Sequence, residues 1–259
     1  MTEDGYLLDN AQRQAGERFA ALSELLDPWT QRHLLDVGLG KGWHCWEIGA
    51  GGPNLPVWLA QRVGPAGRVV ASDIDPSWMD APANYEVLRH DVATDEAPGT
   101  FELIHARLVL VHVPARDAII AKLVGALRPG GWLVLEDADP ALQPLLSPDE
   151  PAEALGNRLR TGFRALMADR GVDLAFGRTL PRRLREAGLV EVRADAYFPI
   201  TGPACAALET ATVLQIRAQL LAAGLATEAE IARHLDNVAS GRMDLATAPL
   251  ISAWGRREY

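Results

Sequence analysis

A glycine-rich turn between a short apolar run and a helical segment most constrains the fold of this chain. The run His44–Ile48 has strand character, the turn reads Gly49-Ala50-Gly51-Gly52-Pro53, and the apolar pattern of Leu55–Val63 predicts a helix. Glycines permit left-handed backbone dihedrals and let a ligand approach the main chain closely. The helix behind the turn presents free N–H groups at its start. This order of strand, turn and helix therefore predicts a ligand-binding unit at the end of a strand.

Further strand-like and helical runs alternate after this unit. Strand character recurs at Arg68–Ser72, at Tyr85–Arg89, in the run that begins at Phe101, and at Trp132–Glu136. Pro114–Leu127 predicts a helix, with proline in its first turn. Strands and helices that alternate with short loops form parallel βαβ units.

Helical patterns dominate both ends of the chain. An apolar stripe from Leu8 to Leu26 predicts a helix that ends at Asp27-Pro28, because the residue before proline is pushed out of the helical region. In the back half, Ser147-x-x-Glu150 and Thr227-x-x-Glu230 have the spacing of capping boxes. The remaining predicted elements are helices at Thr30–Val37, Ser147–Asp169, Thr179–Ala187, Pro203–Ala223 and Thr227–Val238, and strands at Leu189–Phe198 and Pro249–Trp254.

Composition narrows the classes of function. The 25 Lys and Arg against 34 Asp and Glu give a net charge of −9, which disfavours nucleic-acid binding because that needs clustered cations. Cys45 and Cys205 lie far apart and form no CxxC, so neither a disulfide framework nor a zinc site is expected. No run spans a bilayer, and the acidic start lacks the features of a signal peptide. The sequence therefore predicts a cytoplasmic protein without membrane or nucleic-acid partners.

Acidic residues stand at the ends of three predicted strands. Asp73 ends the second strand, where a carboxylate can accept both hydroxyls of a ribose. Asp91 follows the third strand and could accept an adenine amino group, with a backbone contact from Val92. A single such Asp is more often a turn former or helix cap, but the order of Glu47, the glycine turn, Asp73 and Asp91 favours a nucleoside site. A dinucleotide site would need glycine where Asn54 stands.

These residues lie in segments that resemble class I S-adenosylmethionine-dependent methyltransferases, namely Cys45–Gly52, Val69–Pro76, Phe101–Pro114 and Leu127–Glu136. The two ends of the chain resemble actinobacterial small-molecule members. The resemblance implies an α/β fold with a doubly wound, seven-stranded, mostly parallel Rossmann-like sheet, an antiparallel last strand, an N-terminal helical segment and helical lid insertions. It also implies S-adenosylmethionine as cofactor, S-adenosylhomocysteine as product and no metal.

One departure from the family pattern is Pro53, which stands where a third glycine is common. Proline lacks an N–H, so we expect a rearranged contact to the methionine carboxylate of the cofactor. Three candidates carry alternatives. Arg107 could pair with that carboxylate or hold a surface ion pair, Trp78 could cover the adenine or pack as a buried helix residue, and Tyr6 could close over the cofactor or pack under the chain end. The expected cofactor-binding set is Glu47, Gly49, Ala50, Gly51, Asn54, Asp73, Ile74, Trp78, Asp91, Val92, Ala106 and Arg107.

Candidates for the chemistry follow the fourth and fifth strands. Methyl transfer requires alignment of nucleophile, methyl and sulfur, and a hydroxyl acceptor also requires a base. His112 suits that role, with Glu136 or Asp137 as its orienting partner, and Asp139 is a further candidate. His105 is interpreted as a satisfied core histidine. The other histidines, His33, His44, His90 and His234, show no partner in the sequence.

The resulting hypothesis is methyl transfer to a small molecule, such as a natural-product intermediate, with O-methylation favoured over N- or C-methylation. The alternative is a cofactor-binding protein without methyl transfer, either a cyclase-like catalyst or a regulator. A nicotinamide-dependent dehydrogenase is disfavoured by Asn54 and by the absence of a Tyr-x-x-x-Lys pair. The acceptor is expected to contact the insertions Ala141–Gly177 and Pro203–Ser240 together with the N-terminal helix, and homodimerisation is left open. We predict a single domain over 1–259, with a helical cap at 1–42, a cofactor core at 43–139, and insertions with the last strands at 140–259.

Overall fold

A mixed β-sheet forms the centre of the computed structural model, which describes residues 7–8, 13–79, 84–143, 146 and 150–259. Within these residues the sheet has seven strands in the order β3-β2-β1-β4-β5-β7-β6. All pairs up to β4–β5 are parallel, whereas β7 is antiparallel to both of its neighbours. The expected fold class is thereby confirmed. The strands are β1 (His44–Ile48), β2 (Arg68–Asp73), β3 (Glu86–Arg89), β4 (Phe101–Arg107), β5 (Leu127–Ala138), β6 (Val190–Tyr197) and β7 (Leu250–Arg256).

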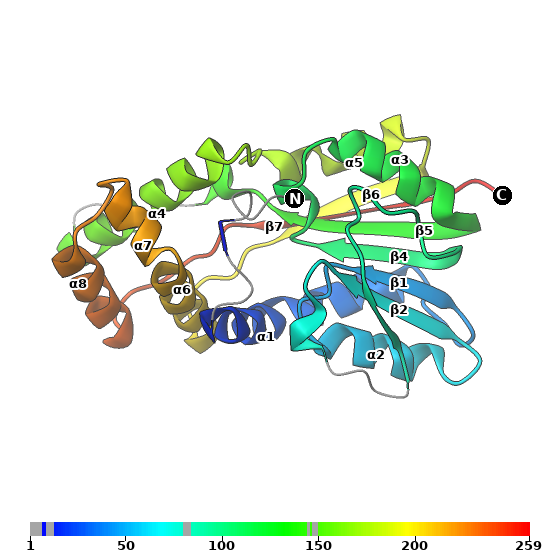
Figure 1. Cartoon of the computed structure of the whole chain (residues 1–259), viewed down its shortest axis with the longest axis horizontal. Helices are drawn as coiled ribbons and strands as arrows, with labels where there is room; N and C mark the ends of the chain where they lie inside the picture. Colours follow the sequence, from blue (N-terminus) through cyan, green and yellow to red (C-terminus); the bar gives the residue numbers. More distant parts are fainter. Residues whose placement is uncertain (1–6, 9–12, 80–83, 144–145, 147–149) are drawn as a thin grey trace. The chain divides into compact units, whose positions relative to one another are not determined.

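Helices cover both faces of this sheet. Figure 1 shows α2 on one face and α3 with α5 on the other. The remaining helices precede the sheet or belong to the back half of the chain. The helices are α1 (Arg13–Asp36), α2 (Asn54–Val63), α3 (Arg116–Ala126), α4 (Pro151–Asp169), α5 (Phe176–Glu186), α6 (Pro203–Gln215), α7 (Arg217–Ala222) and α8 (Glu228–Ala239).

The chain divides into two compact units. The sheet unit comprises residues 26–138, 175–197 and 250–259, and the helical unit comprises residues 1–25, 139–174 and 198–249. The boundary before Asp139 falls next to the predicted end of the cofactor core, but both units are assembled from three separate segments. The prediction of one domain with three consecutive parts stays a prediction.

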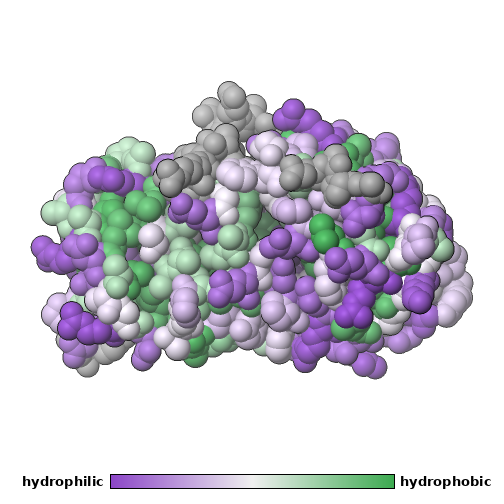
Figure 2. Space-filling view, turned by 90° about the horizontal axis from the view of Figure 1, so that it is seen from below, coloured by the Kyte–Doolittle hydropathy of each residue, from purple (hydrophilic) through white to green (hydrophobic). Residues whose placement is uncertain are grey.

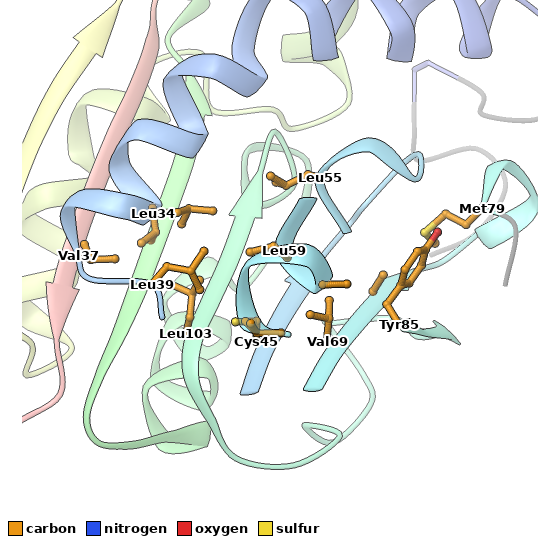
Figure 3. Packing of buried hydrophobic residues seen from close by; sticks show 14 residues of the cluster. Leu34, Val37, Leu39, Cys45, Leu55, Leu59, Val69, Met79, Tyr85 and Leu103 are labelled. Carbon is orange, nitrogen blue, oxygen red and sulfur yellow. The ribbon is translucent and has the colours of Figure 1, made fainter. Parts of the chain in front are cut away.

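One hydrophobic cluster of the sheet unit lies between β1, β2 and β4 and the helices on their α2 side. Leu34 of α1, Leu59 of α2 and Leu103 of β4 are fully buried in it, and Figure 3 shows their side chains gathered with those of Cys45 and Val69. Burying a leucine of this size contributes about 1.5–3 kcal/mol. The helical unit has its own core, in which Leu159 of α4 packs with Leu220 of α7 and Ile231 of α8.

The surfaces of the two units differ on the face seen in Figure 2. Hydrophilic residues cover most of the visible surface of the sheet unit, whereas hydrophobic areas are more extensive over the helical unit.

The predicted division of the chain into helices was wrong in two places. Pro28 lies inside α1, so the two predicted N-terminal helices are one. The helix continues because the residues after Pro28 are held by the sheet unit, where Thr30, His33 and Leu34 are fully buried. Their packing offsets the backbone hydrogen bond that proline removes. The predicted helix Pro203–Ala223 divides into α6 and α7 at Ile216, whose side chain is buried in the core of the helical unit.

The two predicted capping boxes have different outcomes. Thr227 caps α8, its hydroxyl accepting from the Glu230 N–H while the Glu230 carboxylate accepts from the Thr227 N–H, as predicted. The box at Ser147–Glu150 lies largely outside the described residues, and α4 begins at Pro151 with Glu150 as its N-cap.

Candidate functional site

The glycine turn after β1 packs against the loop that follows β4. A Cβ added to Gly49 would lie 2.2 Å from Cγ2 of Val109, so any larger residue would force the Val109 side chain to shift. Gly49 and Gly51 both have a φ of 63°, a left-handed conformation that favours glycine. The Gly49 and Ala50 N–H groups donate to the Ser72 carbonyl at 2.7 and 3.1 Å, which fixes the turn at the end of β2.

The start of α2 behind this turn has no side-chain cap. Pro53 is the N-cap residue, with a φ of −81°, and no side chain accepts from the first turn of the helix. Asn54 is exposed, while Pro56 adds a second proline without an N–H. Neither proline can donate a backbone N–H at the start of this helix, and the rearranged contact expected from Pro53 stays a prediction.

Asp73 binds the glycine turn as well as ending β2. Its Oδ2 accepts from the Gly51 N–H at 3.0 Å, and its Oδ1 accepts from the Asp75 N–H at 3.0 Å. The side chain is buried, and burial raises the pKa of the carboxyl although these N–H donors lower it. The sequence pointed to a ribose-binding carboxylate but not to this structural link. Each oxygen keeps a second lone pair for a ligand hydroxyl.

Apolar side chains beside Asp73 remain open to solvent. Ile74 is 41% exposed and Trp78 is 37% exposed. Trp78 is thus not fully buried, and its part in covering the adenine stays a prediction.

After β3 the predicted adenine contacts take part in a turn. Asp91 accepts from the Ala93 N–H at 2.9 Å, while the Val92 side chain is buried and its carbonyl accepts from Lys122. The turn-forming role of Asp91 is thus present in the structure, and its part in adenine binding stays a prediction.

Arg107 at the end of β4 is held by α1. Its Nη2 lies 2.7 Å from Oδ1 of Asp27, and its Nη1 donates to the Thr30 hydroxyl at 2.8 Å. Arg107 thus forms an ion pair with Asp27, and both side chains have little solvent exposure, unlike the expected surface ion pair. Ala106 is buried within β4, and Leu108 adopts a left-handed φ of 58° directly after the strand. Such a conformation is uncommon outside glycine and is often found at functional sites.

His112 ends the 3-10 turn Leu110–His112 in the loop after β4. Two side chains hold the backbone of this loop. Arg116 donates to the carbonyls of Leu110 and Val111 at 2.9 and 2.8 Å, and Asp137 accepts from the Val111 N–H at 3.2 Å. Burial raises the pKa of the Asp137 carboxyl well above its usual range, and its Oδ1 has no hydrogen-bond partner among the described residues. Asp137 is therefore placed to fix the loop that carries His112.

Glu136 points to the opposite face of β5, because successive residues of a strand alternate. Its carboxylate accepts hydrogen bonds from the Thr30 and Ser252 hydroxyls and lies 3.0 Å from Nδ1 of His33 and 3.4 Å from Nε2 of His105. None of these Glu136 partners is His112, whereas Asp137, the other predicted orienting carboxylate, binds the backbone of the loop that carries His112. The catalytic roles of His112, Glu136 and Asp137 stay predictions. Asp139 is buried at the start of the helical unit.

His105 is a buried histidine with two carboxylate partners, which agrees with its interpretation as a satisfied core residue. Its Nδ1 lies 2.6 Å from Oε2 of Glu47, and its side chain is fully buried. Although burial lowers the pKa of His105, the charges and hydrogen bonds of Glu47 and Glu136 raise it to about 9. Burial raises the pKa of Glu136, but its hydrogen bonds with His105 and His33 outweigh this effect. The pKa of Glu136 therefore lies far below its usual range.

Sequence reasoning missed the residues that complete this group. Thr30 and His33 come from α1, and Ser252 comes from β7. Thr30 and His33 stand three residues apart in α1, a spacing that places both side chains on one face of the helix. In the helical unit, His234 also has a partner that the sequence did not reveal, since its Nε2 lies 2.9 Å from Oε1 of Glu209.

A model of protein families described as a methyltransferase domain matches residues 7–193. The chain belongs to this methyltransferase family. The match confirms the expectation of a class I methyltransferase, and S-adenosylmethionine is the cofactor of the family. The narrower actinobacterial small-molecule type is not confirmed.

Two curated relatives are fungal. Methyltransferase str3 of Strobilurus tenacellus is 28% identical over 170 residues, which cover 63% of this chain and 59% of that protein. Methyltransferase str2 of the same fungus is 29% identical over 192 residues, which cover 71% of this chain and 67% of that protein. The chain thus spans about six tenths to two thirds of the length of these relatives.

Solved structures share the fold. A phosphoethanolamine N-methyltransferase 2 of Haemonchus contortus, in complex with phosphomonomethylethanolamine and S-adenosylhomocysteine, superposes with a TM-score of 0.60 at 14% identity. The superposition covers 100% of this chain and 61% of that chain. At this identity the likeness concerns the fold alone.

The described residues contain no group of three or more His, Cys, Asp or Glu side chains arranged to hold a metal ion. None of the helices within the described ranges is long and apolar enough to cross a bilayer.

Proposed function

We propose that this protein transfers the methyl group of S-adenosylmethionine to a small-molecule acceptor, in the manner of the actinobacterial small-molecule enzymes that its sequence resembles. The observation that carries the proposal is the edge of the sheet formed by the ends of β1 and β2. There a close-packed glycine turn, the Asp73 carboxylate and the exposed side chains of Ile74 and Trp78 lie within one short stretch of structure. A nucleoside needs hydroxyl acceptors and an apolar cover, and these residues supply both.

When bound, the cofactor supplies an electrophilic methyl group on a sulfonium sulfur. Asp73 would hold the ribose hydroxyls, while Ile74 and Trp78 would cover the adenine and Asp91 with Val92 would meet its edge. Glu47, Gly49, Ala50, Gly51, Asn54, Ala106 and Arg107 complete the proposed cofactor set. The uncapped start of α2 and the left-handed glycines leave the main chain open to close approach, which fits such a ligand.

The proposed acceptor is a natural-product intermediate that is methylated on a hydroxyl oxygen. A hydroxyl needs a base to remove its proton, and His112 is proposed for that role because it follows β4 in a loop whose backbone Arg116 and Asp137 hold. We further propose that the insertions 141–177 and 203–240 select the acceptor. They carry apolar stripes, and hydrophobic areas are extensive on the visible surface of the helical unit.

Transfer of labelled methyl from S-adenosylmethionine to a panel of phenols, alcohols and amines tests the proposal. We expect labelled product with a hydroxyl-bearing acceptor. Tight binding of S-adenosylmethionine without product across the panel would instead favour the alternative, a cofactor-binding catalyst or regulator of the same fold. Light scattering of the same preparation decides whether the protein is a homodimer.

His112→Ala tests the assignment of the base. We expect turnover to fall by about 10²–10⁴, the usual range for general acid–base catalysis, with cofactor affinity nearly unchanged. The loss should shrink at high pH, where the acceptor ionises unaided. His44→Ala is the matched control, because His44 begins β1 at the opposite end of the strand and bonds to Arg128. Near-full turnover of His112→Ala at neutral pH would contradict the assignment.

A further inference from the structure

A row of alternating carboxylates and imidazoles crosses the sheet unit on the face of α1. His105 lies between Glu47 and Glu136, with distances of 2.6 Å and 3.4 Å from its two ring nitrogens to their carboxylate oxygens. His33 lies between Glu136 and Asp195, with corresponding distances of 3.0 and 2.9 Å. Each imidazole is thus shared by two carboxylates, and the row begins at the strand that ends in the glycine turn.

Strand register produces this row. Glu47 of β1 pairs with His105 of β4, so the two side chains stand side by side on one face of the sheet. Glu136 of β5 lies two residues beyond Val134, the partner of His105, and therefore points to the same face. Ser252 pairs with both Glu136 and Asp195, which brings β7 and β6 into the row. Helix α1 lies over it and contributes His33.

Burial makes the charges in this row depend on one another. His33, His105 and Glu136 have no exposed side-chain surface, and Glu47 has 3%, whereas Asp195 at the edge of the sheet has 36%. An ionised carboxylate without a partner is very costly in such a place. The row holds three carboxylates against two imidazoles, so each buried carboxylate relies on an imidazole that carries a proton.

Other charged groups also face these residues. Arg107 acts on Glu47 and Glu136 from the end of β4, and it is itself paired with Asp27. Arg32 of α1 donates to Asp195 at 2.7 Å and also lies 2.9 Å from Nε2 of His33. The hydroxyls of Thr30 and Ser252 donate to Glu136. The Glu136 end of the row is therefore well supplied with donors, whereas Glu47 has His105 as its hydrogen-bonded side-chain partner.

We propose that His105, supported by Glu136 and His33, is a positioning residue that keeps the Glu47 carboxylate ionised and in one orientation for the positively charged cofactor. The proposal rests on the proposed function, because it needs Glu47 to face the cofactor. Burial raises the pKa of Glu47, and His105 is the foremost group that lowers it. Loss of the imidazolium would therefore leave Glu47 protonated at a higher pH, and a protonated Glu47 no longer attracts a cation.

Calorimetric titration with S-adenosylhomocysteine between pH 5 and pH 9 tests the proposal, because its amino group is cationic over most of this range. In the wild-type protein we expect affinity to fall toward acid pH as Glu47 protonates. In His105→Gln this fall should move to higher pH by about one to three units, the effect of one adjacent opposite charge. In Glu47→Gln the fall should be absent. A His105→Gln variant whose affinity drops equally at every pH would show a structural role only and overturn the proposal.

Two further variants keep the test decisive. His33→Gln removes a more distant positive charge, so we expect a smaller shift in the same direction, and this variant carries the test if His105→Gln does not fold. His234→Gln breaks a comparable buried histidine–glutamate contact in the helical unit and should leave the pH profile unchanged. If the wild-type protein does not bind S-adenosylhomocysteine at any pH, the proposed function fails. If it binds and neither His105→Gln nor His33→Gln moves the profile, the positioning role alone fails.

Discussion

Each unit buries a cluster of histidine and glutamate, and the two clusters are built differently. In the helical unit, Glu209 of α6 is shared by Arg160 of α4, at 3.0 Å, and His234 of α8, at 2.9 Å. One carboxylate thus faces two basic side chains, and they lower the pKa of Glu209 in spite of its burial. In the sheet unit, the carboxylates outnumber the imidazoles between them.

The two carboxylates of the sheet unit that flank His105 have pKa values shifted in opposite directions. The pKa of Glu136 lies far below its usual range, whereas burial raises the pKa of Glu47 although His105 and Arg107 oppose it. A cluster rich in positive partners fixes its single negative charge and links three helices. In the sheet unit three carboxylates share two imidazoles, and the charge of Glu47, which precedes the glycine turn, depends on His105 and Arg107. The comparison predicts that the helical cluster serves stability alone, while the sheet cluster serves stability and ligand binding.

The largest loss in the free energy of unfolding is expected from Glu136→Ala. The change leaves His33 and His105 without the carboxylate between them, and breaking a buried pair in this way costs about 3–5 kcal/mol. Urea unfolding measures the loss in the free energy of unfolding. Glu209→Ala is the matched change in the helical cluster. It should also destabilise the protein, but without altering the affinity of the folded protein for S-adenosylhomocysteine. A loss of that affinity in Glu209→Ala would break the comparison.

The second prediction concerns pH and stability. The pKa of His105 is about 9 in the folded protein, raised by Glu47 and Glu136 against the effect of burial, and its ordinary value is 6.5. Because the folded state binds this proton more tightly, the stabilisation is complete below pH 6.5 and is lost as pH rises to 9. The loss is on the order of 2–4 kcal/mol. Urea midpoints across this window measure it, and His105→Gln should reduce the slope. A wild-type midpoint that stays constant from pH 6.5 to 9 would be incompatible with a protonated His105.

The third prediction concerns Asp73, whose carboxylate binds the glycine turn rather than another side chain. Asp73→Ala removes an acceptor proposed for the ribose and frees the Gly51 and Asp75 N–H groups. Hydrogen bonds to a charged group contribute about 1.5–3 kcal/mol, so affinity for S-adenosylmethionine should fall about tenfold to a hundredfold. Calorimetry measures the change. Asp91→Ala should have a milder effect, and the reverse order would exchange the ribose and adenine ends of the proposed site.

The smallest change in stability is expected from the loss of an exposed ion pair. Arg182 and Glu186 lie one helical turn apart on α5 at 3.0 Å, and both side chains are more than half exposed. Such pairs contribute about 0.3–0.5 kcal/mol. Glu186→Gln should therefore leave the urea midpoint nearly unchanged, while the buried pairs above do not tolerate the corresponding change. A large loss in Glu186→Gln would show that burial is not what separates the two kinds of pair.

Several features of the molecule followed from local pattern. The alternation of apolar strands and helices predicted the parallel part of the sheet, and His44–Ile48 was placed with its observed bounds. Gly49 and the strand-end carboxylates predicted a ligand-binding edge, because short-range backbone geometry and strand ends are encoded by neighbouring residues. The capping box at Thr227 is local in the same sense. The number of strands and the antiparallel last strand came from the family resemblance rather than from the pattern, and the order of the strands came from the structure.

Only the tertiary structure decided how distant segments meet. Pro28 stays helical because the residues after it are buried against the sheet, which outweighs a local preference. Trp78 is exposed, Arg107 is paired with Asp27, and Glu136 faces α1 instead of the loop of His112. His33 and Glu136 are separated by more than a hundred residues, and His105 stands beside Glu47 through the register of β4 with β1. A sequence gives the type and order of such residues, but their charges are set by contacts that exist only after the strands have paired and α1 has packed upon them.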